Sequence, residues 1–582
     1  MATVIVQNWQ KNKYTFSDGS PIPSPPATLQ TLKWMPGDVV SVEPVAATVV
    51  ETVVETLAAT SVATTAPVLK RTMPRIVVVG VVDVLNRTRF GTTSRGVPLY
   101  IMYPVDVSYP PFLIALKTKP ATNVFVKVKY EHWDGIWPRA SLEKLIGPVG
   151  DLNSELSAMI QTLPPLPSGT AIETATEATR HTIQDWDVVL HIDPPGCKDV
   201  DDILCWKRRD NNIVFGIGIA DVAHWIPEGS EIDRAAFDRG ATLYHDGTAI
   251  EPMLPSLISE SVASLRCDST PRPAVCLIFE LVYEAGKWKR VAQHWELHML
   301  RVSESYTYDS ISENTERAAE VRTYLSAVCD QELNIDSHEW IEQAMILYNR
   351  TVAEELQRAG VGVLRVHAGT TNEEYTALSM KTGISEIGWL GSAAGTYVHS
   401  CENTGHAGLS LACYTHASSP LRRYVDLINQ RWIRALKFGF PAPVTTSKAE
   451  PHDLNLRSKR IRRLERDMYF VSRALRSHTE SSVSTVSSVS DGYLLSQRIC
   501  TGCPGCPGDV SNSQQWRIYV PDWKRVVTCA LLSASATAVE PGFGLALALA
   551  LALAPGDKVS VKAYFDIRQA NWCRRMIYQA NV

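Results

Sequence analysis

Short hydrophobic runs separated by turn residues occur toward both ends of the chain. Residues 75–80 and 124–130 have the composition of strands, and glycines between them favour turns. The C-terminal part repeats this pattern over 492–495, 516–521, 556–562 and 574–578. Many short strands with frequent turns are typical of small β-barrels. The pattern therefore predicts barrel-type domains on both sides of a central region.

Helical periodicity is strongest at residues 454–475. Apolar residues recur there at intervals of three and four, which predicts a buried stripe made of Ile461, Leu464, Met468, Val471 and Leu475. The rest of this helix is basic, with Arg457, Lys459, Arg460, Arg462, Arg463 and Arg466. Such a face is either a solvated surface or the lining of a phosphate path. Further helices are predicted over 153–163 and from the region of Ile335 onward.

The chain has 582 residues, which is too long for a single hydrophobic core. We expect a multidomain α+β protein with four parts: a first barrel (1–74), a second barrel with a linker (75–180), a central domain (181–480) and a C-terminal barrel (481–582). Residues 46–67 are low in complexity and rich in Ala, Thr and Val, so we interpret them as an insertion into the first barrel. The alternating Leu and Ala of 545–554 are interpreted in the same way.

Composition places few limits on function. The formal net charge is −4, which does not indicate a nucleic-acid binder but leaves room for a local basic channel. The sequence shows neither a membrane-spanning stretch nor the basic flank of a signal peptide. The 12 cysteines are scattered, which is typical of reduced thiols. We therefore expect an intracellular protein, in the cytoplasm or the nucleus, without a membrane partner.

The strongest candidate for chemistry is the segment from His191 to Asp202. It contains four aspartates, at Asp193, Asp199, Asp201 and Asp202, after an apolar run that predicts a buried strand. Pro194-Pro195-Gly196 then favours a turn. Carboxylates gathered in one pocket repel each other unless a cation neutralises them, and Mg²⁺ or Mn²⁺ prefers such oxygen ligands. The segment is thus suited to two-metal phosphoryl chemistry.

Two other interpretations of this segment remain open. It can be an acidic loop on a solvated surface, although the flanking apolar runs place it beside a core. It can also be a structural Ca²⁺ loop, but the spacing and the closing Glu of an EF-hand are absent.

Several segments follow in a fixed order and together resemble one family. They are the aspartate segment, Ile219–His224, Arg239–Tyr244, Pro252–Pro255 and Tyr414–Asp426 with its Ser-Pro-Leu-Arg-Arg-Tyr core. In this order they resemble the ribonuclease II/ribonuclease R (RNB) family of 3′→5′ exoribonucleases, most strongly over 183–475. The resemblance implies an RNB catalytic domain, a mixed sheet with surrounding helices. It also implies flanking N-terminal cold-shock OB barrels and a C-terminal OB-type RNA-binding barrel.

The resemblance also implies roles for individual residues. Asp193, Asp199, Asp201 and Asp202 would hold one or two Mg²⁺ ions, and Asp201 would be the most sensitive to replacement. Arg422 would stabilise charge on the reacting phosphate, and Tyr244 would stack on the 3′-terminal base. The remaining RNA-binding residues implied are Tyr308, Glu342, Arg423, Glu465 and Arg466. His367 and His416 are expected to be structural.

The expected activity is stepwise hydrolysis of single-stranded RNA to nucleoside 5′-monophosphates. The alternative is a catalytically weak RNA-binding scaffold or regulator with the same fold. An endonuclease or a DNA phosphodiesterase is a third possibility. We expect a monomer, with membership of an RNA-processing complex left open. Separately, Cys500, Cys503 and Cys506 have knuckle-like spacing for Zn²⁺, with Cys529 or Cys573 as a fourth ligand.

Overall fold

The computed structural model of the chain has two compact units. One unit comprises Pro164–Asp467, and the other comprises Met1–Leu163 with Met468–Val582. The structure describes residues 2–16, 28–36, 38–41, 68–70, 76–167, 181–369, 372–390, 392, 394–444, 451–476, 485–500, 513–529, 531–532, 553–571 and 575–581. The insertion predicted at 46–67, most of that at 545–554, and Cys503, Cys506 and Cys573 lie outside these residues, as does the side chain of Cys500.

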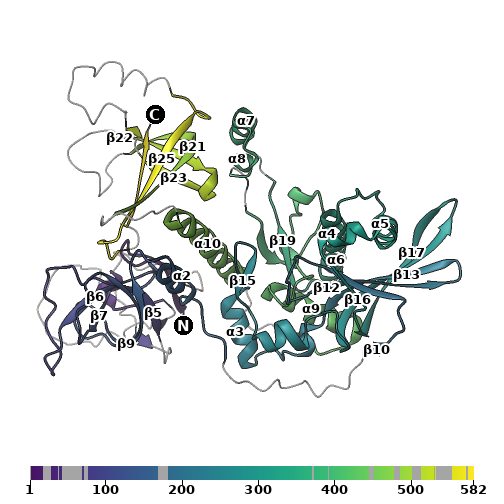
Figure 1. Cartoon of the computed structure of the whole chain (residues 1–582). Helices are drawn as coiled ribbons and strands as arrows, with labels where there is room; N and C mark the ends of the chain where they lie inside the picture. Colours follow the sequence, from purple (N-terminus) through teal and green to yellow (C-terminus); the bar gives the residue numbers. More distant parts are fainter. Residues whose placement is uncertain are drawn as a thin grey trace, which may run out of the picture. The chain divides into compact units, whose positions relative to one another are not determined.

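The unit Pro164–Asp467 is built on a seven-stranded mixed sheet with the order β10-β17-β16-β13-β12-β11-β18 (Figure 1). Its strands are β10 (Thr182–Ile183), β11 (Val188–Ile192), β12 (Asp202–Arg209), β13 (Asn212–Ala220), β16 (Arg272–Glu284), β17 (Lys287–Leu300) and β18 (Glu304–Tyr306). Neighbours from β17 to β11 pair antiparallel, whereas β10 and β18 pair parallel at the two edges. The central strands are apolar on both faces, which indicates a sheet covered on both sides.

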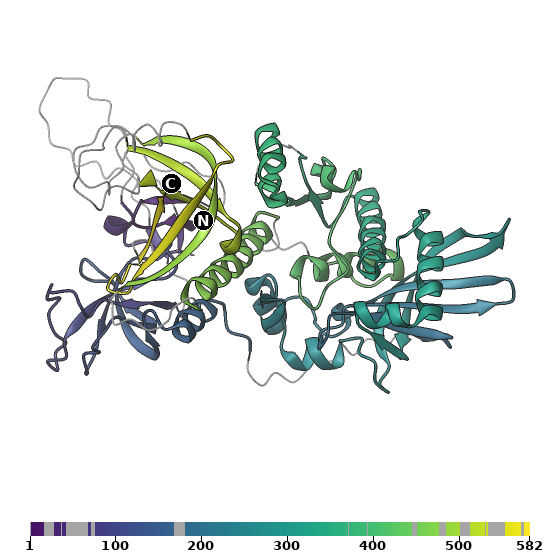
Figure 2. The same ribbon diagram turned by 45° about the horizontal axis from the view of Figure 1, so that its top comes forward.

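Helices cover the two faces of this sheet. One face packs on α5 and α6, with Phe215 and Leu277 facing Leu325 and Val352 in one apolar cluster. The other face packs on α3 and the first half of α9 in a second cluster. At one end, the strands extend beyond the helices (Figure 2). The helices are α3 (Glu231–Arg239), α4 (Tyr308–Glu313), α5 (Thr315–Cys329), α6 (Ser337–Ala359), α7 (Glu373–Thr382), α8 (Ser385–Trp389) and α9 (Tyr424–Phe438).

Smaller elements complete this unit. They are the hairpin β14 (Leu243–His245) and β15 (Thr248–Glu251), the pair β19 (Val363–Val366) and β20 (Thr396–His399), and four one-turn helices, Val222–His224, Ile258–Val262, Ser400–Glu402 and Ala407–Leu409. The long helix α10 (Pro451–Arg476), of which the residues up to Asp467 belong to this unit, contains the predicted amphipathic segment 454–475. Of its predicted stripe, Ile461, Met468, Val471 and Leu475 are buried, and Leu464 is half-buried.

The second unit contains the strands predicted at both ends of the chain. Within the described residues one closed barrel forms, from β5 (Val77–Val82), β6 (Leu99–Pro104), β7 (Phe112–Ala115), β8 (Val124–His132) and β9 (Arg139–Pro148). Before it, β1 (Ala2–Asn8), β2 (Lys13–Phe16), β3 (Val39–Ser41) and β4 (Val68–Lys70) form a four-stranded sheet that shares a core with the barrel. The helices α1 (Leu29–Leu32) and α2 (Leu152–Ile160) also belong here, and Asp151 caps α2 by accepting from the Ser154 N–H.

The C-terminal segment of the second unit is a six-stranded sheet with the order β23-β22-β21-β25-β26-β24. Its strands are β21 (Thr485–Cys500), β22 (Ser513–Val520), β23 (Arg525–Cys529), β24 (Leu531–Leu532), β25 (Lys558–Asp566) and β26 (Met576–Asn581). Among the helices that the structure describes, none is long and apolar enough to cross a membrane.

Candidate active site

The aspartate segment joins two neighbouring strands of the central sheet. β11 ends at Ile192, and the Asp193 N–H continues its pairing by donating to the Tyr306 carbonyl at 3.1 Å. The predicted turn follows, with the Cys197 N–H donating to the Pro194 carbonyl and Gly196 at φ 78°. The chain re-enters the sheet at Asp202, the first residue of β12. The turn thus brings the acids back to the end of β11, beside the core rather than on a solvated surface.

Asp201 is 3% exposed and links the two main motifs of the sequence. One carboxylate oxygen accepts from the Leu421 N–H at 2.8 Å, and the other accepts from the Arg422 Nε at 3.1 Å. Arg422 also donates from Nη2 to the Ser419 Oγ at 3.0 Å, while its side chain stays 44% exposed. The guanidinium is therefore oriented by two contacts and still presents donors to solvent.

Asp199 contacts Tyr244, a residue of β14. The Tyr244 hydroxyl donates to the Asp199 carboxylate at 3.1 Å, and the Tyr244 N–H donates to the Glu465 carboxylate at 3.3 Å. Burial and the charge of Asp199 raise the pKa of Tyr244, so the phenol remains protonated. These contacts hold Tyr244 between the aspartate segment and α10.

The charges of the four acids act on one another. Burial, and next the charge of Asp193, raise the pKa of Asp202 to about 7. Burial also raises the pKa of Asp201, with smaller contributions from Asp202 and Asp199, and Arg422 opposes the rise. Asp193 itself contacts the His191 Nδ1 at 2.8 Å. A cluster with this much unbalanced negative charge favours a cation.

The donor set fits a hard divalent ion, because four carboxylates supply only oxygen ligands. Among the described residues, no group of three or more His, Cys, Asp or Glu side chains has a geometry that could hold a metal ion. Both oxygens of Asp201 already have protein donors, so Asp193, Asp199 and Asp202 are the acids with more capacity for a metal.

Comparison with known protein families supports the resemblance drawn from the order of the motifs. Residues 180–334 and 320–439 match the family model of the RNB domain. Residues 180–439 therefore contain an RNB domain.

Individual relatives are distant. The chain is 24% identical over 417 residues to "Exosome complex exonuclease RRP44 homolog A" of Arabidopsis thaliana, covering 55% of this chain and 44% of that protein. It is 26% identical over 404 residues to "Ribonuclease R" of Thermotoga maritima, covering 54% and 56% respectively. The chain thus spans about half the length of these relatives. The fold is similar to that of Mycoplasma genitalium RNase R in its apo form, with a TM-score of 0.63, 14% identity and full coverage of both chains.

Other residues implied by the resemblance lie in several places of the RNB domain. Tyr308 opens α4 and stacks on His338, with ring centroids 3.8 Å apart. Burial, and next the charges of Asp202 and Asp193, raise its pKa to about 12, so the aspartates act on this phenol. Glu342 is exposed on α6, one helical turn beyond His338. Tyr308 is thus coupled electrostatically to the acids, whereas Glu342 shares a helix face with the stacking partner of Tyr308.

The basic face of α10 has mixed roles. Arg457 pairs with Asp238 and Asp453, and Arg460 donates to the Asp238 carbonyl, so these two arginines attach α10 to α3. Arg463 pairs with Asp467 on the same helix, and Arg466 is exposed next to Glu465. The solvated or structural interpretation therefore holds for part of this face.

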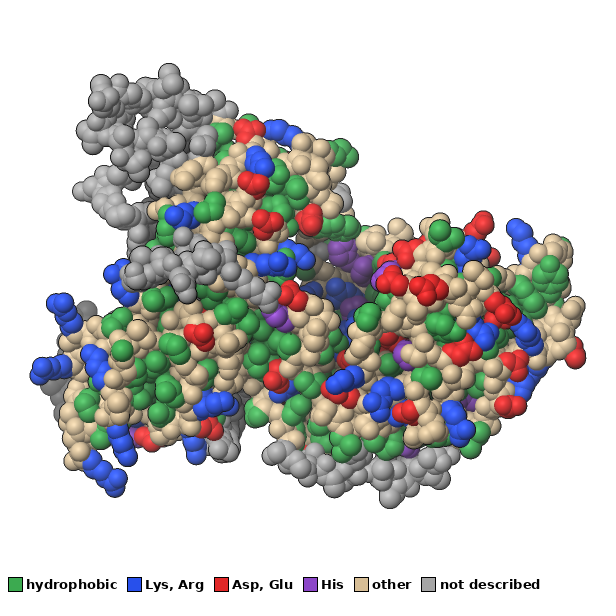
Figure 3. Space-filling model, in the orientation of Figure 1, with side chains coloured by type: hydrophobic (Ala, Val, Ile, Leu, Met, Phe, Trp, Pro, Cys, Tyr) green, Lys and Arg blue, Asp and Glu red, His purple; other side chains and the backbone are tan. Residues whose placement is uncertain are grey.

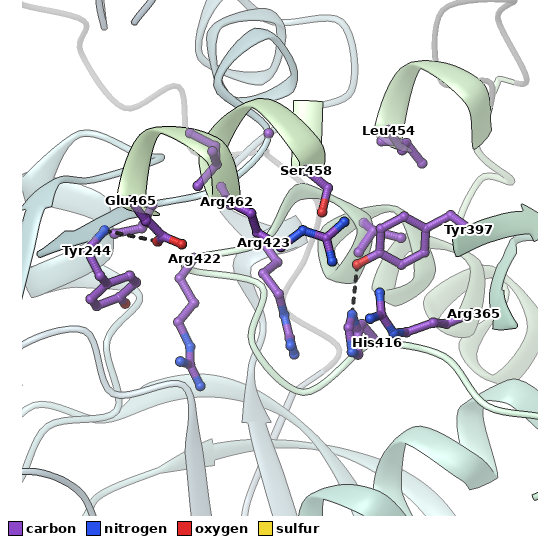
Figure 4. A pocket seen from close by; sticks show the side chains of 15 residues that line it. Tyr244, Arg365, Tyr397, His416, Arg422, Arg423, Leu454, Ser458, Arg462 and Glu465 are labelled. Carbon is purple, nitrogen blue, oxygen red and sulfur yellow. Dashed lines mark hydrogen bonds between the residues drawn. The ribbon is translucent and has the colours of Figure 1, made fainter. Parts of the chain in front are cut away.

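Arg462 is different, because it lines a cleft of the unit Pro164–Asp467 together with Arg365, Arg422 and Arg423 (Figure 4). Sequence reasoning did not select Arg365 or Arg462 individually, and it placed His416, which also lines this cleft, among structural residues. Elsewhere, on the face in Figure 3, acidic and basic side chains are interspersed. Positive charge is thus concentrated locally, as a net charge of −4 allows.

Proposed function

We propose that this protein is a metal-dependent 3′→5′ exoribonuclease that hydrolyses single-stranded RNA stepwise to nucleoside 5′-monophosphates. The observation that carries the proposal is the contact between Asp201 and Arg422, which joins the acidic motif to the Ser-Pro-Leu-Arg-Arg-Tyr motif. The names of the relatives, an exosome complex exonuclease and a ribonuclease R, support the same activity.

Each motif has a role in this chemistry. Asp193, Asp199 and Asp202 would hold Mg²⁺ or Mn²⁺, which would supply Lewis-acid activation of the phosphate and of water. Asp201 orients Arg422, because its carboxylate accepts from Nε. The outer donors of Arg422 then face the reacting phosphate and stabilise the charge that develops there. Hydrolysis adds water across the terminal phosphodiester, which leaves a 3′-hydroxyl on the shortened strand and a 5′-phosphate on the released nucleotide.

Tyr244 and Tyr308 would contact the 3′ end of the strand. The Tyr244 ring is half-buried beside Asp199, which suits stacking on the terminal base next to the scissile bond. Tyr308 and Glu342 would contact the nucleotide end, and Arg423, Glu465 and Arg466 would also contact the RNA strand.

The barrel elements extend this proposal to RNA capture. We assign the five-stranded barrel and the C-terminal sheet to OB-type RNA-binding domains, within the expected boundaries 75–180 and 481–582, and the N-terminal sheet to a reduced first barrel. We further propose a monomer that works on RNA inside the cell. Eight cysteines among the described residues carry free thiols, which supports a reducing compartment.

The test is digestion of a 5′-labelled single-stranded RNA by the full chain, with Mg²⁺ or EDTA, analysed on a denaturing gel. Wild type should shorten the RNA from its 3′ end to one short labelled fragment only with Mg²⁺, and Asp201→Asn should lose this activity. Asp185→Asn is the matched control, because that side chain is fully exposed and only weakly paired.

Other products would support other functions. Intact RNA that still shifts on a native gel would indicate a binding protein that retains the fold. Internal fragments would indicate an endonuclease. Equal digestion of the matching DNA would show that the ribose 2′-hydroxyl is not recognised.

A further inference from the structure

The cleft in Figure 4 has a volume of about 310 Å³ and lies next to the Asp201–Arg422 pair. We call it the basic cleft and define it by Arg365, Tyr397, His416, Arg423 and Arg462. Its apolar wall consists of Val425, Leu454 and Ile461. In Figure 4, the side chains of Arg365, Arg423 and Arg462 gather around Tyr397 and His416, whereas Arg422 lies nearer Tyr244 and Glu465.

The arginines of the basic cleft are only partly neutralised. Arg423 pairs with Asp426 at 2.8 Å. Within the part of the chain that the structure describes, neither Arg365 nor Arg462 has a carboxylate at ion-pair distance. Burial, and next the charge of Arg365, lower the pKa of the Arg462 guanidinium, which reflects the mutual repulsion of these cations. Glu465 also lines the cleft and its charge acts on Arg462, but the lining arginines outnumber this carboxylate. The cleft therefore keeps an excess of positive charge that an anion would balance.

The surrounding residues hold Arg365 in place. The Arg365 guanidinium lies over the Tyr397 ring, 5.5 Å from its centroid, and it packs against Gly395, where an added Cβ would come within 2.9 Å of it. The Tyr397 hydroxyl lies 2.8 Å from the His416 Nδ1. Burial, and next the charges of Arg423 and Arg365, lower the pKa of His416 well below its usual range, so this imidazole is neutral. A neutral imidazole accepting the Tyr397 proton carries its own proton on Nε2, as a further donor.

We propose that the basic cleft is a phosphate subsite, in which Arg365, Arg423 and Arg462 bind one phosphate group next to the reacting centre. Planar guanidinium groups with fixed orientations are well suited to phosphate oxygens. The excess positive charge of the cleft favours binding of a negatively charged phosphate group. Two sources carry this chemistry, a phosphodiester of the bound RNA strand and the phosphate monoester of the released nucleotide.

The choice of RNA and nucleotide as the two phosphate sources rests on the proposed function, but binding of either to the basic cleft can be measured without turnover. Arg462→Leu and Arg365→Leu remove one cation each from the cleft. Arg463→Leu is the matched control, because this neighbouring residue on α10 is 61% exposed and pairs with Asp467. Arg462→Lys retains the charge but loses the planar fork. Thermal unfolding shows that each variant is folded.

Two equilibrium measurements in EDTA distinguish the sources. Calorimetry with AMP and with inorganic phosphate measures the monoester. Fluorescence anisotropy with labelled single-stranded RNA over a range of salt concentrations measures the strand, because each lost phosphate contact lowers the slope of log K against log salt by about 0.7. We expect affinity for the bound species to fall about tenfold or more in both leucine variants, with partial recovery in Arg462→Lys.

The outcomes separate clearly. Weaker AMP binding with an unchanged RNA salt slope assigns the subsite to the released nucleotide, and the reverse assigns it to the strand. If AMP binding weakens and the RNA salt slope also falls, the same subsite binds both the released nucleotide and the strand. If folded Arg462→Leu and Arg365→Leu bind AMP, phosphate and RNA as Arg463→Leu does, the proposal is wrong. Failure of the proposed function would instead appear as absent digestion with Mg²⁺ while these binding results stand.

Discussion

Replacing Arg422 separates transition-state stabilisation from RNA binding. Arg422 donates from Nε to Asp201 at 3.1 Å and from Nη2 to Ser419 at 3.0 Å, which fixes the plane of the guanidinium. Removing a preorganised donor from a developing charge lowers kcat by about 10²–10³, or about 2.7–4 kcal/mol. We expect this loss in Arg422→Ala. In Arg422→Lys, the loss should be only slightly smaller, because one ammonium group cannot bridge both partners and also face the phosphate.

Effects on folding and on ground-state binding should be much smaller. Breaking a fully buried ion pair costs about 3–5 kcal/mol, but Arg422 is 44% exposed. Solvent therefore screens the pair, and a cost of about 1–2 kcal/mol is expected for unfolding. RNA affinity in EDTA should fall about tenfold, as for the loss of one charged hydrogen bond.

Single-turnover digestion with excess enzyme measures the chemical step directly. Equilibrium RNA binding in EDTA and thermal unfolding provide the other two quantities. Arg350→Lys is the control, since Arg350 is 51% exposed and forms only a surface pair with Glu354. A folded Arg422→Ala that retains more than about a tenth of the wild-type single-turnover rate would refute this placement of Arg422 beside the reacting phosphate.

Three further outcomes are expected. Tyr244→Phe should retain most activity because it keeps the ring, whereas Tyr244→Ala should lose about 1–3 kcal/mol of RNA binding, measured by anisotropy; equal losses would exclude a stacking role. In metal-free protein, Asp202 binds its proton more tightly in the folded state (pKa about 7) than in the unfolded chain. Unfolding in EDTA should therefore show stability falling as pH rises from about 4 to about 7. In Asp202→Asn, stability should depend less on pH, and Mg²⁺ should oppose the loss of stability in the wild type. If stability falls equally steeply with pH in the variant, Asp202 is not the source of the pH dependence. In the second unit, Arg575 donates to both Glu155 oxygens at 2.7 and 2.9 Å with both side chains buried. Arg575→Met should destabilise this unit by about 3–5 kcal/mol in urea, and adding Glu155→Met should recover much of the loss; additive losses would show that the pair contributes little.

Local patterns in the sequence were sufficient for several features. The apolar run before Asp193 and the Pro-Pro-Gly turn predicted a strand followed by a return, and the structure has β11, the turn and β12 there. The spacing of Ile461, Met468 and Val471 predicted the buried face of α10. The order of the motifs predicted an RNB domain, which the match to the RNB family model confirmed. These features depend on interactions between residues close in the chain, where periodicity and turn chemistry carry the information.

Features that depend on distant residues were not predictable in the same way. The many short strands predicted a β-barrel at each end of the chain. Whether a sheet closes into a barrel depends on which edge strands pair with each other. Among the described residues, only β5 to β9 close. The six cations of α10 look alike in sequence, but contacts with α3 occupy Arg457 and Arg460, while Arg462 faces the basic cleft.

The sequence by itself determined which chemical groups this protein has: four carboxylates within ten residues, an Arg-Arg pair and two tyrosines in a fixed order. Only the tertiary structure decided their partners. Asp201 meets the Leu421 N–H and Arg422 across a separation of 220 residues or more, because the segment after the turn returns to the sheet beside the loop before α9. Arg365 enters the same region from β19. Such contacts arise from the packing of distant elements, which no local pattern of residues encodes.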